Sequence, residues 1–152
     1  MNFLTYNGQI NYFQIFKMSL LKISDGEFWN NINKEFSNGG GIYKVIATDN
    51  EKPIAIQRLL DIDTEGILYI GKATSFLERV IILKTSTDPD YNSSNHEFGA
   101  RYKEHQSLKI KFPYDKLFVH FLASDKPEIL ERETLKNYYD KFGELPPLNR
   151  RQ

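Results

Sequence analysis

The stretch Leu68-Tyr69-Ile70-Gly71-Lys72-Ala73-Thr74-Ser75-Phe76-Leu77-Glu78-Arg79 decides the fold. An apolar run ends at a glycine, and Ser75 with Glu78 three residues later has the spacing of a helix capping box. The stretch therefore predicts a strand, a glycine turn and a helix that carries Arg79 near its start. Functional sites are commonly built at such junctions of strand, turn and helix.

Two other stretches have the composition of strands. Residues 41–47 are rich in β-branched and aromatic side chains, which favour extended backbone. Residues 116–123 are apolar on both alternating faces, as in a strand that is covered on both sides. Together with a strand at 67–71, they predict an α+β fold with a small three-stranded, mainly antiparallel sheet flanked by helices.

Capping patterns predict where three further helices begin, because an N-terminal serine or aspartate and a following glutamate bind the free backbone N–H groups of the first turn. These patterns occur at Ser24 and Glu27, at Ser94 and Glu97, and at Asp125 and Glu128. The last helix is predicted to run through Phe142 and to stop at Gly143, a residue type that favours helix C-termini.

Length and composition bound the class of protein. A chain of 152 residues with 40% hydrophobic side chains is expected to form one domain, 1–152, with an N-terminal arm and helix at 1–39. The absence of cysteine excludes disulfides and thiolate zinc sites. No apolar run approaches membrane-spanning length, so we expect a cytoplasmic protein with no membrane partner.

One carboxylate in the last predicted helix lies on its apolar side. Leu135, Tyr138 and Phe142 follow Glu131 at helical spacing, which puts all four on one stripe, whereas Glu133 falls on a polar stripe. A carboxylate that faces a core is costly unless it is paired or binds a cation, so Glu131 is a candidate metal ligand. The alternative is a salt bridge or a tolerated boundary position.

Other groups are weaker candidates for a metal site. The acidic run 61–65 lacks the twelve-residue calcium-loop pattern, so we interpret it as a solvated loop. His96, His105 and His120 are scattered along the sequence and form no ligand motif. We interpret His120, which lies in a predicted strand, as a core residue.

Several short motifs occur in a specific order along the chain. They are Gly41-Ile42-Tyr43, Tyr69-Ile70-Gly71, Arg79 eight residues after Gly71, Leu130-Glu131, Tyr138, Pro146 and Asn149. Single triplets of this kind are weak signals, but their ordered co-occurrence is strong. Over about residues 40–149 the chain resembles the GIY-YIG nuclease superfamily, which implies the same α+β fold and a nuclease core in that range.

Two features depart from the pattern of that superfamily. The segment between Tyr43 and Tyr69 is longer than in its compact members and is similar to that of its restriction enzymes. Lys84 occupies the region where many members carry a histidine. The resemblance therefore leaves open which residue assists the catalytic base.

The resemblance implies a magnesium-dependent endonuclease that hydrolyses phosphodiester bonds in double-stranded DNA. Tyr43 would be the general base, Arg79 would hold the scissile phosphate and Glu131 would ligate one Mg²⁺ ion. Tyr69 and Asn149 would be supporting residues of the catalytic site. Tyrosine is a poor base at its usual pKa near 10, so we expect nearby positive charge to favour its ionised form.

The charge balance locates the expected contact with DNA. The chain has 20 basic and 20 acidic residues, and the basic ones are in excess only between positions 71 and 120. Candidate phosphate contacts in this segment are Lys72, Lys84, Arg101 and Lys103.

A homodimer is compatible with the sequence. The alternatives are a nucleic-acid-binding module that does not cleave, and a structural or partner-binding protein on the same fold.

Overall fold

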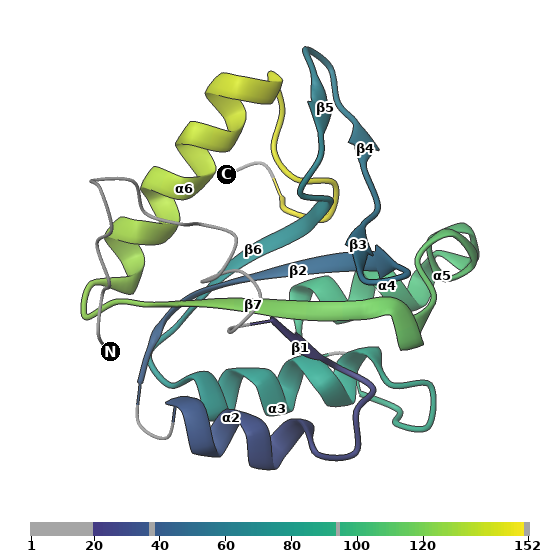
Figure 1. The fold of residues 1–152 in the computed structure, drawn as a ribbon, viewed down its shortest axis with the longest axis vertical. Coiled ribbons are helices and arrows are strands. Elements are labelled where there is room, and N and C mark those ends of the chain that lie inside the picture. Colours follow the sequence, from purple (N-terminus) through teal and green to yellow (C-terminus); the bar gives the residue numbers. More distant parts are fainter. Residues whose placement is uncertain (1–19, 37–38, 94, 151–152) are drawn as a thin grey trace.

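Strand β2 (Gly41–Asp49) is the centre of the sheet and is paired along both of its edges (Figure 1). Its neighbours are β6 (Ile67–Ala73) and β7 (Leu117–Ala123), and β7 in turn pairs with β1 (Leu20–Lys22). The end of β2 also pairs with β3 (Lys52–Pro53). Every pairing is antiparallel, which confirms the predicted fold class and sheet type.

The computed structural model describes residues 20–36, 39–93 and 95–150. The prediction of a three-stranded sheet was wrong, because the sheet has five strands. The two additional strands contain three and two residues, too few for an alternating pattern to reveal them. The predicted N-terminal arm lies almost entirely outside the described residues.

Helices cover both faces of the sheet, as Figure 1 shows. Three of them lie on one face, namely α2 (Phe28–Phe36), α3 (Phe76–Thr87) and α4 (Glu97–Glu104). Helix α6 (Pro127–Phe142) lies on the other face, against β2 and β6. The short helices α5 (Gln106–Lys111) and η1 (Tyr114–Lys116) lead from α4 into β7. Within the described residues, no helix has the length and apolarity needed to cross a membrane.

The helix starts follow the capping signals in part. Ser75 caps α3 as predicted, since its side chain accepts a hydrogen bond from the Glu78 N–H at 3.4 Å. Helix α4 is capped instead by His96, whose side chain accepts from the Phe98 N–H. The predicted cap at Ser94 lies outside the described residues. Histidine is not a usual capping residue, so sequence pattern gave no reason to expect it.

The other two helices begin later in the chain than their predicted caps, Ser24 and Asp125, would place them. Helix α2 begins at Phe28, and the Glu27 N–H is bound by the side chain of Asp25. Helix α6 begins at Pro127 without a side-chain capping bond at its N-cap, Lys126. Its C-terminus is as predicted, because Gly143 follows it with a φ of 75°, a left-handed conformation that suits glycine.

The segment between Tyr43 and Tyr69 contains a separate two-stranded ribbon, β4 (Ile56–Gln57) and β5 (Ile62–Asp63). The ribbon is held against the end of α6 and the chain that follows it. The Leu60 N–H donates to the Phe142 carbonyl at 3.1 Å, and the Arg58 guanidinium donates to the Leu145 carbonyl at 2.7 Å. The additional length in this segment is therefore built onto the fold at the C-terminal end of α6.

Asp63 corrects the interpretation of residues 61–65 as a solvated loop. Its side chain is buried, with 1% of the residue exposed. Its carboxylate accepts from the backbone N–H groups of Glu65, Gly66 and Ile67 at 2.9, 3.2 and 2.9 Å, and from the Tyr138 hydroxyl at 2.9 Å. A buried carboxylate is tolerated when several donors bind it, and these donors join the start of β6 to α6.

We predict that Asp63→Ala lowers the free energy of unfolding by about 3 kcal/mol, because four donors lose a buried acceptor. Urea denaturation of the two proteins measures the difference. The matched control is Asp61→Ala, which removes an exposed carboxylate from the same ribbon and should change stability little. Equal losses in the two variants would contradict the role given to Asp63.

Candidate active site

The side chain of Tyr43 lies across Gly71 on the neighbouring strand. The β2–β6 ladder places these two residues directly opposite each other. A Cβ atom on Gly71 would come within 2.5 Å of the Tyr43 hydroxyl and of the ring carbon that bears it, and within 2.7 Å of the Tyr69 ring. Glycine is therefore required at position 71 by close approach of the two tyrosines.

The Tyr43 hydroxyl contacts a side chain from each of two helices. The Nε of Arg79, on α3, donates to it at 3.2 Å. The Nε2 of His96, immediately before α4, lies 2.7 Å away. The hydroxyl, Arg79 and His96 thus meet between the sheet and the starts of α3 and α4.

The other ring nitrogen of His96 indicates which way this hydrogen bond runs. Nδ1 accepts from the backbone N–H of Phe98 at 3.1 Å, so it carries no proton. Burial, followed by the charge of Arg79, lowers the pKa of His96 to about 3, which keeps the ring neutral near pH 7. A neutral ring with an accepting Nδ1 has its proton on Nε2. We infer that His96 and Arg79 both donate to the Tyr43 oxygen.

Neighbouring positive charge favours the ionised form of Tyr43, as expected, but burial acts more strongly against that form. Burial raises the pKa of Tyr43 to about 12, although the charge and hydrogen bond of Arg79 act in the opposite direction. Desolvation of the phenolate therefore outweighs the neighbouring cation. In the protein alone, Tyr43 holds its proton at neutral pH.

Tyr69 lies beside Tyr43 and is held from α4. The two ring centroids are 6.1 Å apart, and the Tyr69 hydroxyl donates to the Glu97 carboxylate at 3.5 Å. Burial raises the pKa of Tyr69, and the Coulombic influence of Tyr43 raises it further. Consecutive residues at the start of α4, His96 and Glu97, therefore contact the hydroxyls of the two tyrosines.

Glu131 lies on the side of α6 that faces the sheet, as the helical period predicted, whereas Glu133 is exposed. Only 19% of the Glu131 side chain is accessible, and its carboxylate lies 3.7 Å from the Lys72 ammonium. Burial raises the pKa of Glu131, while the charges of Lys72 and Arg79 oppose the rise. Glu131 is thus a partly desolvated carboxylate within the electrostatic reach of the Tyr43 and Arg79 cluster.

The carboxylate of Glu131 suits a magnesium ion better than a metal that requires a full cage of protein ligands. No group of three or more histidine, cysteine or acidic side chains that could hold a metal occurs in the described part of the chain. Mg²⁺ commonly binds one or two carboxylates and completes its coordination with water and substrate phosphate. The donor set at Glu131 fits that mode of binding.

Asn149 acts on the backbone of β6. Its side-chain amide donates to the Ile70 carbonyl at 2.8 Å, and its side-chain oxygen accepts from the Ile70 N–H at 2.9 Å. These two bonds pair the edge of β6 next to Gly71 with the tail that follows α6. Asn149 therefore supports the strand that carries Tyr69, and its contacts are with backbone.

The structure places two of the four candidate phosphate-binding cations beside residues of this site, Lys72 beside Glu131 and Arg101 beside Glu97. Lys72 lies between Glu131 and Glu128, at 3.7 and 3.3 Å. Lys84 donates to the Ile23 carbonyl and to the Tyr114 hydroxyl, and its ammonium lies 5.5 Å from the centroid of the Phe28 ring. Lys84 thus joins the residue after β1 to α2 and η1.

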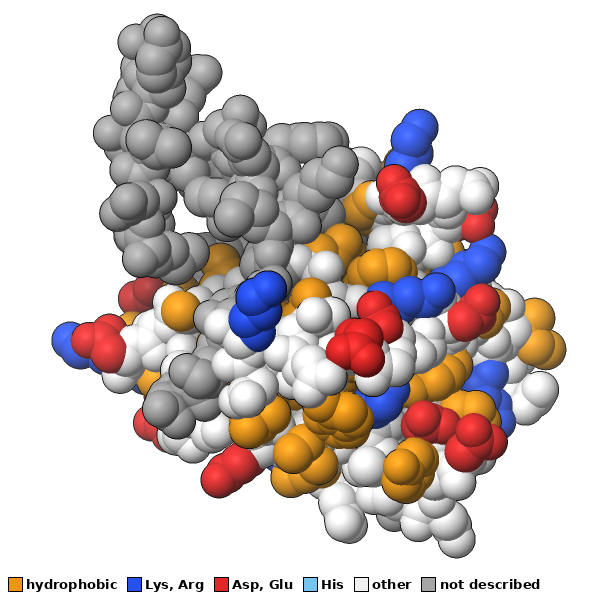
Figure 2. All heavy atoms as spheres, turned by 60° about the horizontal axis from the view of Figure 1, so that its bottom comes forward, with side chains coloured by type: hydrophobic (Ala, Val, Ile, Leu, Met, Phe, Trp, Pro, Cys, Tyr) orange, Lys and Arg blue, Asp and Glu red, His pale blue; other side chains and the backbone are white. Residues whose placement is uncertain are grey.

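The remaining two candidates also bind other parts of the chain. Lys103 donates to the carbonyls of Tyr91 and Ser93 in the loop before α4. Arg101 pairs with Glu97 at 2.8 Å and donates to the Leu148 carbonyl. Figure 2 shows basic and acidic side chains interspersed over the face it presents, without a continuous basic patch. Phosphate contact by these residues stays a prediction.

His96 and Glu97 are site residues that sequence reasoning missed. His96 was judged to be one of three scattered histidines, and Glu97 was interpreted only as part of a capping box. Both follow a polar loop, so neither a strand nor a helix period placed them beside the tyrosines. A histidine next to a predicted helix start was the one available signal.

Comparison with known proteins does not add an assignment. No family model, curated protein or solved structure matches this chain. A functional assignment therefore depends on the chemistry and geometry of the residues described above.

We predict that Gly71→Ala destabilises the protein by about 1–3 kcal/mol, because the new methyl group overlaps the Tyr43 ring. Thermal and urea unfolding measure the loss. Gly26→Ala is the matched control, since a Cβ there meets nothing within 4 Å. In a Tyr43→Ala background the cost of Gly71→Ala should fall, and an unchanged cost would show that the two residues are not in the contact described.

Proposed function

We propose that this protein is a magnesium-dependent endonuclease that hydrolyses phosphodiester bonds in DNA. The observation that carries the proposal is the Tyr43 hydroxyl, buried between the Arg79 and His96 side chains at 3.2 and 2.7 Å. A structural tyrosine needs one hydrogen-bond partner, whereas two N–H donors directed at one phenol oxygen stabilise its ionised form. The order of motifs that resembles the GIY-YIG superfamily supports the same assignment.

In the proposed reaction, Tyr43 first loses its hydroxyl proton to solvent and then, as the phenolate, accepts the proton of the attacking water. The two donors favour the phenolate, and burial opposes it until further positive charge comes near. The proton leaves the water as the bond to phosphorus forms, so the base acts mainly in the transition state. His96 keeps one donor on the Tyr43 oxygen throughout, because its other nitrogen is occupied by the Phe98 N–H.

Arg79 is proposed to neutralise the phosphate while it orients Tyr43. Its Nε is bound to the Tyr43 hydroxyl, and the terminal nitrogens of the guanidinium are proposed to contact phosphate oxygens. A guanidinium stays charged at any working pH and matches phosphate geometry. The same cation would then favour both the ionised base and the negative charge that gathers at phosphorus.

Glu131 is proposed to hold the magnesium ion, with Lys72 as its counter-charge in the protein alone. A bound divalent ion supplies positive charge for the leaving oxygen. Glu131 lies on α6 and Lys72 on β6, and the ion pair between them joins these two elements. Release of Lys72 from the carboxylate would leave its ammonium available to a neighbouring phosphate.

A second candidate function is a nucleic-acid-binding module that does not cleave. The observation that favours it is the Lys72 ammonium, which already neutralises Glu131 at 3.7 Å. Incubating the purified protein with plasmid DNA in Mg²⁺ or in a chelator distinguishes the nuclease from the non-cleaving binding module. Nicking that requires Mg²⁺ supports the nuclease, and binding without nicking in either buffer supports the module.

We predict that Glu131→Gln abolishes cleavage and leaves the melting temperature close to that of the wild type, because the amide keeps the shape of the side chain but loses its charge. Glu133→Gln, on the exposed side of the same helix, is the matched control and should cleave normally. Nicking rates in Mg²⁺ and melting temperatures of both variants test this. A similar loss of activity in both would remove Glu131 as the metal ligand.

We predict that the single-turnover cleavage rate rises with pH, by about tenfold per unit between about pH 6 and 9, if no other step limits it. The reason is that Tyr43, with its pKa raised to about 12, is protonated throughout this range, and its ionised fraction grows with pH. His96, with a pKa near 3, does not titrate there.

Tyr43→Phe should lose the activity, whereas Tyr139→Phe, at an exposed tyrosine, should keep both rate and slope. A flat wild-type profile would contradict the assignment of the base.

A further inference from the structure

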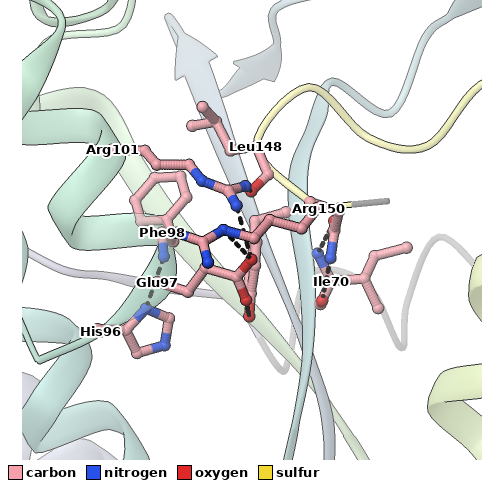
Figure 3. Close-up of polar contacts among 9 residues, drawn as sticks. Ile70, His96, Glu97, Phe98, Arg101, Leu148 and Arg150 are labelled. Carbon is pink, nitrogen blue, oxygen red and sulfur yellow. Dashed lines mark hydrogen bonds and ion pairs between the residues drawn. The ribbon is translucent and has the colours of Figure 1, made fainter. Parts of the chain in front are cut away.

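Three charged side chains, Glu97 and Arg101 of α4 and Arg150 of the C-terminal tail, lie close together (Figure 3). The Glu97 carboxylate is at the centre of this cluster. It pairs with the Arg101 guanidinium at 2.8 Å and with the Arg150 Nε at 3.6 Å, and it accepts from the Tyr69 hydroxyl at 3.5 Å. The cluster therefore adjoins the two tyrosines of the candidate active site.

The two arginines of this cluster are in different surroundings. Arg101 has 19% of its side chain exposed and also donates to the Leu148 carbonyl, so it joins α4 to the tail. Arg150 has 76% of its side chain exposed. Arg101 therefore serves the fold, and Arg150 presents most of its guanidinium to solvent.

The position of Arg150 is set by the residues just before it. The Leu148 N–H donates to the Leu68 carbonyl at 3.0 Å, and Asn149 binds both backbone groups of Ile70. The tail thus runs along β6 up to the residue next to Gly71. These bonds fix the backbone at Arg150 beside β6, while most of the Arg150 side chain is exposed to solvent.

We propose that Arg150 binds a backbone phosphate of the nucleic acid next to the scissile one, with Glu97 and Arg101 as positioning residues. The proposal rests on the proposed nuclease function. Contacts lead from Arg150 through Glu97 and Tyr69 to Tyr43, where the scissile phosphate would lie. Successive phosphates of a strand advance about 3.4 Å along a duplex, so a strand bound at Tyr43 presents further phosphates around the site.

The charges of Glu97, Arg101 and Arg150 favour reversible binding of a phosphate. Two guanidinium groups and one carboxylate give a net positive charge beside the strand. Glu97 holds both arginines when no phosphate is present, and Arg101 offsets the repulsion that the carboxylate would exert on a bound phosphate. A guanidinium bound only at Nε keeps its two terminal nitrogens for a bidentate contact with phosphate oxygens.

The test compares Arg150→Ala with Lys136→Ala in binding to a short DNA duplex in the presence of a chelator, across a series of salt concentrations. Lys136 is a matched control, because 71% of its side chain is exposed and it is also paired with a carboxylate, Asp140. Loss of one phosphate contact should weaken binding and reduce the slope of log affinity against log salt by about 0.9. Arg150→Ala should show this reduction, and Lys136→Ala should match the wild type.

A second variant distinguishes a positioning role for Glu97 from a merely structural one. Tyr69 and Arg101 donate to different oxygens of Glu97, so Glu97→Gln keeps an acceptor for only one of them while it removes the negative charge. We expect it to bind the duplex about fivefold more tightly at low salt, because one charge a few ångströms from a phosphate is worth about 1 kcal/mol near water. A residue that only maintained the fold would give weaker binding when changed. Weaker binding by Glu97→Gln would overturn the proposal.

The outcomes also separate this inference from the proposed function. If wild-type protein cleaves DNA and Arg150→Ala has the same salt slope as Lys136→Ala, the nuclease stands and the phosphate site at Arg150 is wrong. If the wild type neither binds nor cleaves DNA under any condition, the proposed function fails and the phosphate site fails with it.

Discussion

The packing of the Tyr43 ring over Gly71 is the constraint on which the candidate site depends. It requires β2 and β6 to pair in one register, because a shift of one residue would replace the glycine with a side chain and turn Tyr43 to the other face. That register is supported from both sides, since β2 also pairs with β7 over seven residues. The glycine and the tyrosine are therefore one structural unit contributed by two strands.

Burial and hydrogen bonding act against each other at the Tyr43 hydroxyl. Burial disfavours the phenolate strongly enough to raise the pKa to about 12, while Arg79 and His96 direct donors at the same oxygen. The result is a phenol that is preorganised for ionisation yet protonated in the protein alone. Additional positive charge near the hydroxyl would favour the phenolate, which is a physical basis for the proposed dependence on a metal ion and substrate.

The site is assembled from segments that are distant in the chain and joined by a few polar contacts. Helix α4 supplies His96 and Glu97 to the two tyrosines, α6 supplies Glu131, and the tail fixes the edge of β6 through Asn149. Asp63 performs a comparable task at the start of β6, where it binds three backbone N–H groups and Tyr138. The start and the middle of the strand that carries Tyr69 are thereby held to the C-terminal part of the chain.

Sequence by itself determined the α+β class, the three longest strands, the cap at Ser75, the end of α6 and the inward side of Glu131, because these follow from local periodicity and capping chemistry. It did not reveal β1 or β3, which are too short to show a period, or the burial of Asp63. Only the tertiary structure decided that His96 contacts Tyr43 and that Lys84, Arg101 and Lys103 bind other parts of this chain. The physical reason is that a charge or a ring nitrogen is visible in sequence, whereas its partner is chosen by how remote segments pack.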